Sequence, residues 1–177
     1  MKNYINTQQP LDQMDLKILH FLQHDASLSN LALAAKLALS PPTCLRRVKR
    51  LNDGGWIAKQ VAVLDLDRVG ASLGHGVCAI VEVTLDAQGA EHADAFEAKA
   101  VAEDAVQQCW RVSSGPDFVL IVQALSMPGY LDLTRRLLTQ DANVRNVKAF
   151  FSLKRAKFST ELPLPRVEDL AQRLAPS

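Results

Sequence analysis

The chain has 177 residues, 48% of them apolar, and a formal net charge of +1. This length suits one domain or two small ones, and the composition excludes an intrinsically disordered chain. No apolar run reaches the roughly 18 residues that a membrane span needs. The polar N-terminus also lacks the apolar stretch of a secretory signal, so we expect a cytoplasmic protein with no membrane partner.

Residues 1–60 carry a net charge of +4, and residues 61–177 carry a net charge of −3. A basic first part and a mildly acidic second part suggest two modules with different partners. The three cysteines are far apart and have no CxxC spacing, which predicts buried thiols and neither disulfides nor a zinc site: Cys44, Cys78 and Cys109. His20 and His24 have the i, i+4 spacing of a metal-binding pair, but no third ligand is visible. We therefore expect no metal and no other cofactor.

Three short helices are predicted in the first sixty residues. The first starts at Asp12 as N-cap and runs through LDQMDLKILHFLQHD, and the second follows a cap at Ser29 or Asn30. The third runs from Pro41 to about residue 52, with Ser40 as its N-cap and a stop at residues 53–55, DGG. This order predicts a helix-turn-helix module.

The pattern then changes to strands. WIAKQVAVLDL (56–66) alternates like a strand, and GASLGHG (70–76) is interpreted as a hinge. Further strands are predicted over 75–85, 105–112, 118–125 and 144–154, with helices over 90–103 and 127–139 and an end helix over 166–174. The expected fold class is α+β. We expect a three-helix helix-turn-helix (winged-helix-like) domain over residues 1–58 and a linker strand or hinge over residues 59–75. A ferredoxin-like βαββαβ domain would follow over residues 76–160, and a tail over residues 161–177.

The densest basic cluster lies on the third helix, SPPTCLRRVKRL (40–51). On a helical wheel Cys44, Val48 and Leu51 face the other two helices. The side chains predicted to point the other way are those of Pro42, Thr43, Arg46, Lys49 and Arg50, with Arg47 at the margin and Leu45 beside the apolar stripe. Such a helix fits the major groove of DNA, although a basic run alone could equally be a solvated face. The predicted DNA-binding residues are Ser40, Pro41, Pro42, Thr43, Arg46, Arg47, Lys49 and Arg50.

LDQMDLKIL, followed by SLSNLALAAKLALSPPTCLRRVKRLNDGGWI, resembles the N-terminal module of the Lrp/AsnC (leucine-responsive, feast/famine) transcription regulators. The resemblance runs from residue 11 to about residue 165. It implies a sequence-specific transcriptional regulator that binds double-stranded DNA, has no catalytic residues and controls genes of amino-acid metabolism or transport. It also implies a small-molecule amino-acid effector and homodimers that form through the C-terminal sheet and assemble into an octamer or similar ring.

The resemblance also indicates an effector site. The family has a G-x-x-D turn between the second and third strands of the regulatory unit, and this chain has Ser114-Gly115-Pro116-Asp117 there. Asp117 would receive the ammonium group of an amino acid; the alternative is that it only stabilises a tight turn. Phe150 and Phe151 match positions near the effector, and because neighbouring residues of a strand face opposite ways, we expect one of them to be a core residue.

Two alternatives stay open. One is a tetrapyrrole enzyme on the same architecture, like the sirohaem decarboxylases that resemble this family. The other is a DNA-organising scaffold without an effector. The enzyme would need a basic, histidine-bearing pocket in the C-terminal part, where the chain has only His75 and His92.

Overall fold

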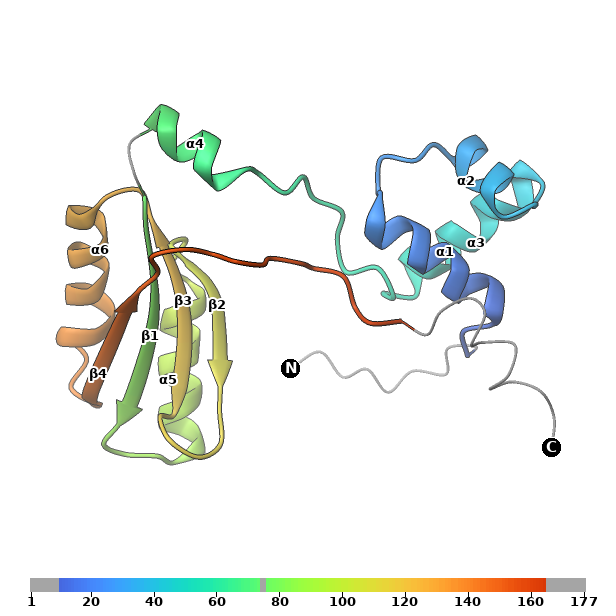
Figure 1. The fold of residues 1–177 in the computed structure, drawn as a ribbon. Helices are drawn as coiled ribbons and strands as arrows, with labels where there is room; N and C mark the ends of the chain where they lie inside the picture. The colour runs from blue at the N-terminus through green and yellow to red at the C-terminus, as the bar shows by residue number, and fades with distance from the viewer. Residues whose placement is uncertain (1–9, 74–75, 165–177) are drawn as a thin grey trace. The chain divides into compact units, whose positions relative to one another are not determined.

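The computed structural model describes residues 10–73 and 76–164, and Figure 1 shows its helices and strands. The chain divides into two units, each with its own hydrophobic core. The described residues up to Ala62 and from Phe158 onward form unit 1, and Val63–Lys157 form unit 2. The end helix predicted over 166–174 lies outside the described residues. None of the described helices is long and apolar enough to cross a bilayer.

Unit 1 contains the three predicted helices, α1 (Gln13–His24), α2 (Asn30–Lys36) and α3 (Pro41–Asp53). Asp12 caps α1 and Ser29 caps α2, as the sequence predicts. The helices bury one side each against the others, and the shared core consists of Ile18, Leu22, Leu33, Ala34, Leu37, Cys44 and Leu51. This core holds α3 in a fixed position and leaves its opposite side open to solvent.

Both α2 and α3 end in the same backbone arrangement. The N–H of Leu39 donates back into the last turn of α2 at 2.9 Å, and the N–H of Trp56 donates back into the last turn of α3 at 3.0 Å. In each case the preceding residue lies in the left-handed region, Ala38 at φ 52° and Gly55 at φ 71°. Glycine adopts this conformation without strain, whereas alanine does so at a cost.

A segment that follows the last strand contributes to unit 1. The side-chain amide of Gln23 donates to the carbonyl of Leu162 at 3.2 Å and accepts from its N–H at 3.0 Å. Beside it, Nε2 of His24 lies 3.2 Å from Oε2 of Glu161. Unit 1 is therefore built from two stretches of chain, one on each side of unit 2 in the sequence.

Unit 2 has the predicted βαββαβ order. Its strands are β1 (Val77–Leu85), β2 (Val106–Arg111), β3 (Phe118–Ala124) and β4 (Val144–Phe151), and its helices are α5 (Ala90–Val101) and α6 (Met127–Thr134), which continues as a π-helical turn (Arg135–Thr139). The strands form one antiparallel sheet in the order β2-β3-β1-β4. Both helices pack on one face of this sheet, and among the described residues no helix covers the other face.

The alternation predicted for β1 is confirmed, because Ala79, Val81 and Val83 are fully buried under the helices. The strand predicted over 56–66 is wrong. Residues 58–65 form neither helix nor strand, and α4 (Leu66–Leu73) follows them, so the glycine at position 70 lies inside a helix. A strand needs a paired neighbour for its backbone groups, and within the described residues this segment has none, which leaves Val61 and Val63 exposed.

Candidate nucleic-acid interface and effector site

The start of α3 is held by side chains around Ser40 and Pro41. Ser40 occupies the N-cap position, but its hydroxyl makes no bond to the helix backbone. Instead, Ser40 Oγ lies 2.8 Å from Oγ1 of Thr43. Asn30 of α2 donates from Nδ2 to the carbonyl of Pro41 at 2.9 Å. These bonds connect the turn between α2 and α3 to the first residues of α3, so the N-terminal end of α3 has a defined position.

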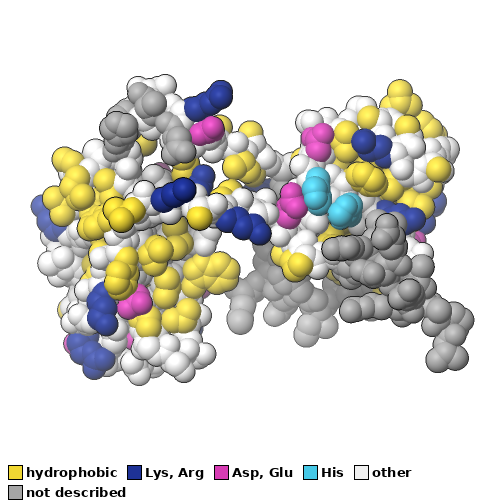
Figure 2. Space-filling model, viewed as in Figure 1, with side chains coloured by type: hydrophobic (Ala, Val, Ile, Leu, Met, Phe, Trp, Pro, Cys, Tyr) yellow, Lys and Arg dark blue, Asp and Glu magenta, His cyan; other side chains and the backbone are white. Residues whose placement is uncertain are grey.

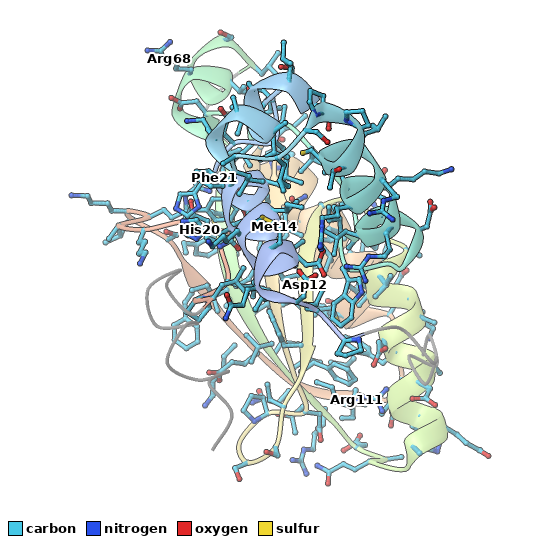
Figure 3. All side chains as sticks on the ribbon, turned by 90° about the vertical axis from the view of Figure 1, so that its right-hand side faces the viewer. Asp12, Met14, His20, Phe21, Arg68 and Arg111 are labelled. Carbon is cyan, nitrogen blue, oxygen red and sulfur yellow. The ribbon has the colours of Figure 1, made fainter. Side chains whose placement is uncertain are left out.

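Two arginines of α3 are tied to α1 by ion pairs. Nη1 of Arg47 lies 2.6 Å from Oδ2 of Asp12 and 2.9 Å from Oδ1 of Asp15, and Arg50 pairs with Oδ2 of the same Asp15. Figure 3 labels Asp12 at the start of α1. The Asp15 side chain is fully buried. The prediction that Arg50 points away from the other helices is therefore wrong, because its guanidinium group reaches back to α1.

The two aspartates also build the start of α1. The N–H of Asp15 donates to Asp12 Oδ1 at 2.8 Å, and the N–H of Asp12 donates to Asp15 Oδ2 at 3.0 Å, which is a reciprocal capping box. Burial raises the pKa of the Asp15 carboxyl, but hydrogen bonds from Arg50, from the Asp12 N–H and from Arg47 outweigh burial and hold this pKa below its ordinary value. Asp15 is thus an ionised group that joins α1 to α3.

The sequence pattern predicted Asp12 only as the helix cap and predicted no role for Asp15. The signal was present as the spacing D-x-x-D in LDQMD, which matches the spacing of a capping box at a helix start. That signal gives the cap. The pairing of Asp15 with Arg47 and Arg50 depends on how α3 packs across α1, so the spacing of residues within α1 could not predict it.

Arg46 and Lys49 are the exposed cations of α3. Within the described residues neither of them makes an ion pair. Beside them, an open depression of about 520 Å³ is lined by Pro10, Asp12, Arg46, Arg47 and Arg50. Of the predicted DNA-binding residues, Pro41 and Pro42 are also exposed, and Thr43 is half-buried. The surface of α3 thus offers free positive charge at two positions, while two further arginines are shared with aspartates.

The predicted effector turn has left-handed backbone at two residues, Ser114 at φ 70° and Gly115 at φ 93°. It is followed by Asp117, whose carboxylate Oδ2 accepts the N–H of Leu85 at 2.7 Å. The amide of Gln88 lies 3.5 Å from the same oxygen. Asp117 therefore ties the turn to the end of β1, as expected of a residue that stabilises a turn, and this does not test binding of an amino acid.

Phe150 and Phe151 lie on opposite faces of the sheet. Phe151 pairs in register with buried Ala79 and packs edge-on against Tyr130 of α6, with ring centroids 5.2 Å apart. Phe150 pairs with Ile80 on the opposite face, away from α5 and α6. Both rings remain about half exposed, at 52% for Phe150 and 47% for Phe151, so the prediction that one of them is a core residue is wrong.

The histidine pair of α1 is accounted for by local contacts. The rings of His20 and His24 have centroids 4.6 Å apart, and Nδ1 of His24 lies 2.9 Å from the carbonyl of His20. Across the part of the chain that the structure describes, no group of three or more His, Cys, Asp or Glu side chains could hold a metal ion.

Comparison with protein families gives two matches. The model of the AsnC-type helix-turn-helix domain matches residues 11–52, and the model of the Lrp/AsnC ligand binding domain matches residues 78–162. These ranges correspond to the three helices of unit 1 and to the βαββαβ unit with the segment that follows it.

Individual relatives are similar over nearly the whole chain. An uncharacterized HTH-type transcriptional regulator of Haemophilus influenzae is 37% identical, and the match covers 89% of this chain and 90% of the relative. The leucine-responsive regulatory protein of Rhizobium meliloti is 31% identical over 87% and 96% of the two chains. Among solved structures, a transcriptional regulator of Neisseria meningitidis in complex with L-Met is 30% identical, with a TM-score of 0.77 and coverage of 88% and 97%.

Proposed function

This chain belongs to the Lrp/AsnC family of transcriptional regulators, and we propose that its regulatory signal is a free amino acid bound by unit 2. The chain combines a DNA-binding helix-turn-helix domain with a ligand-binding domain. A ligand-binding domain implies a small-molecule effector. The structure of the Neisseria meningitidis relative is a complex with L-Met. The observation that carries the proposal is the match of the ligand-binding domain over residues 78–162.

The amino acid would bind at the turn that contains Ser114, Gly115, Pro116 and Asp117. A carboxylate is the natural partner of an ammonium group, and N–H groups of a left-handed turn form a concave site for a carboxylate. Asp117 is already fixed by the N–H of Leu85, so its carboxylate would be positioned before a ligand arrives. The register pairs Phe150 with Ile80 and Phe151 with Ala79, toward the opposite end of β1 from Leu85, so the rings would reach a ligand at this turn only from another protomer.

Thermal melts against each of the twenty L-amino acids test this proposal. A ligand that binds only the folded protein stabilises it by about 2.7 kcal/mol at a hundredfold excess over its dissociation constant. We expect at least one L-amino acid to raise the melting temperature and its D-enantiomer to have no effect, which controls for general salt and solute effects. Twenty flat curves would contradict an amino-acid effector and favour a regulator or scaffold that needs none.

We also propose a homodimer that forms through the open face of the sheet and assembles into an octamer or similar ring. Ile80, Trp110 and Phe150 are exposed at 41%, 58% and 52%, and the register places Ile80 beside Phe150 and Ile121. Figure 2 shows hydrophobic side chains gathered over this part of unit 2. A contiguous apolar patch of this kind is typical of an interface. Light scattering should give an oligomer for the native chain and a smaller species for Ile80→Asp.

The proposal includes no catalytic step and places the regulator in the cytoplasm, where DNA and free amino acids are both available. A purified protein that binds its operator and takes up no added porphyrin would agree with it. Porphyrin uptake with an absorption band would instead favour the tetrapyrrole enzyme.

A further inference from the structure

Four exposed residues between the first and third turns of α3 lie on one side of the helix. Pro42, Leu45, Arg46 and Lys49 have the spacing i, i+3, i+4 and i+7, which places them on one face of a helix, and all four are exposed. Arg47 and Arg50 belong to the neighbouring face, which turns toward the aspartates of α1. The outward face of α3 is thus apolar in its first turns and basic in the next.

Leu45 has no role in the core of unit 1. Its side chain is 58% exposed, whereas the adjacent Cys44 is fully buried. Single exposed leucines are common and need no explanation by themselves. The position of Leu45 makes it informative, since it lies between the exposed Pro42 and the exposed Arg46 in the N-terminal half of the helix. In helix-turn-helix proteins the N-terminal half of the recognition helix, which is α3 in this chain, contacts base edges.

We propose that Leu45, with Pro42 beside it, contacts the 5-methyl group of a thymine in the major groove of the operator. Thymine is the one base of ordinary DNA that presents a methyl group there, so an apolar contact at this point selects T·A over the other pairs. Lys49, one turn further along the same face, would bind a phosphate, and Arg46 would bind a phosphate or a guanine next to the thymine. This inference rests on the DNA-binding function and identifies part of its specificity.

A contact with thymine would also explain why the apolar Leu45 lies beside Arg46 and Lys49 on the exposed side of α3. Charge contacts to phosphates give affinity that does not depend on sequence. Arg46 and Lys49 alone would hold α3 on many sequences equally well. A leucine adds little to phosphate binding but loses contact when the methyl group is absent, so it contributes discrimination in place of general affinity.

Replacement of thymine by deoxyuridine tests the contact, because this change removes the methyl group and keeps the base pair. An operator is first selected from random DNA with the native protein, and each thymine is then replaced in turn. We expect one position in each half-site to weaken binding by about fourfold, the factor that burial of one methyl-sized apolar group gives. Leu45→Ala should bind the thymine and uridine operators equally.

Leu31→Ala is the matched control, because Leu31 is 67% exposed but lies on α2. It should keep the native preference for thymine. Both variants should melt at the native temperature, since neither side chain is buried.

Several outcomes would overturn the proposal. Equal binding of the native protein to all deoxyuridine operators would exclude a methyl contact, and a preference retained by Leu45→Ala would assign it to another residue. A change of oligomeric state in Leu45→Ala would place Leu45 in a protein interface. If the native protein selected no DNA at all, the DNA-binding function itself would fail before the contact was tested.

Discussion

Arg47 connects α3 to α1, because its Nη1 lies 2.9 Å from Oδ1 of the fully buried Asp15. Arg50 reaches the second oxygen of the same carboxylate. A buried carboxylate with two guanidinium partners fixes the position of α3 relative to α1, which apolar packing does with less directional specificity. The ion pairs between α3 and α1 therefore help to determine which side of α3 faces the solvent.

Asp15→Asn should destabilise unit 1. The substitution removes the charge that holds two half-exposed guanidinium groups on a buried side chain, and we expect a loss of about 2 kcal/mol in the free energy of unfolding. Urea unfolding followed by circular dichroism measures this loss. Asp12→Asn is the control: its side chain is 51% exposed and asparagine caps a helix as well as aspartate, so the loss should stay below about 1 kcal/mol. Equal losses in the two variants would contradict the assigned role of Asp15.

Stability should fall in acid through the same group. The pKa of the Asp15 carboxyl is lower in the folded protein than in the unfolded chain, so the unfolded state takes up a proton first as pH falls. The contribution of Asp15 is complete above the unfolded pKa of about 3.9 and is lost as pH falls through the folded pKa. The pKa of Asp141, where burial is outweighed by its bonds to Lys99 and the Asn143 N–H, is also lowered and acts with the same sign.

Melting temperatures between pH 7 and pH 2 should therefore decline below about pH 4 in the native protein. In Asp15→Asn the decline should be shallower, because one of the titrating groups is gone. Identical slopes for the two proteins would show that Asp15 does not titrate with folding.

The basic residues of α3 should separate into two classes. Arg46→Ala and Lys49→Ala should each weaken DNA binding with no change in stability, and Lys49→Ala should also reduce the slope of log affinity against log salt by about 0.9. Arg50→Ala should cost about 2 kcal/mol of stability, because it removes a charged hydrogen bond to a buried carboxylate. Binding titrations at several salt concentrations and urea unfolding of the same variants distinguish the classes. Native stability in Arg50→Ala would argue against the ion pair.

Ala38→Gly should stabilise the turn between α2 and α3. Ala38 has φ 52°, where an alanine side chain is strained and glycine is not, so we expect a gain of about 1 kcal/mol. Ala35→Gly is the matched control, since it places the same change inside α2 and should cost about 1 kcal/mol. Urea unfolding should give opposite signs for the two variants.

Asp117→Asn should separate ligand binding from structure. Asparagine keeps an oxygen that can accept the N–H of Leu85 but loses the charge that would attract an ammonium group. We expect native stability and a thermal-melt response to the amino acid that is reduced at least tenfold in affinity. Asp117→Ala should lose the response and also about 1 kcal/mol of stability. A full response in Asp117→Asn would place the effector elsewhere.

Much of the fold was predictable because its signals are local. Helix caps, proline at a helix start and glycine at a helix end gave α1, α2 and α3 to within a few residues. Alternation gave the buried face of β1, and the order of elements gave the βαββαβ unit. The strand predicted over 56–66 was wrong because its signal is not sufficient by itself. Alternating residues permit a strand, but a strand also needs a partner strand to pair with.

The site was less predictable, because long side chains do not follow the direction of their Cα–Cβ bonds. A helical wheel places Arg50 outward, yet its flexible stem lets the guanidinium group reach Asp15 on another helix. The wheel also gave Leu45 only as a residue that flanks the apolar stripe, and its exposure depends on where α1 and α2 pack. Phe150 and Phe151 are both about half exposed although they lie on opposite faces of the sheet, so alternation along β4 does not predict their exposure.

The bonds between Gln23 and Leu162 have a consequence for synthesis of the protein. Their residues are 139 positions apart, so at 5–20 residues per second the ribosome adds Leu162 on the order of ten seconds after Gln23. Unit 2 lies between these two residues in the sequence, so the ribosome synthesises all of it in that interval. The bonds between Gln23 and Leu162 can therefore form only after the whole regulatory unit has been synthesised.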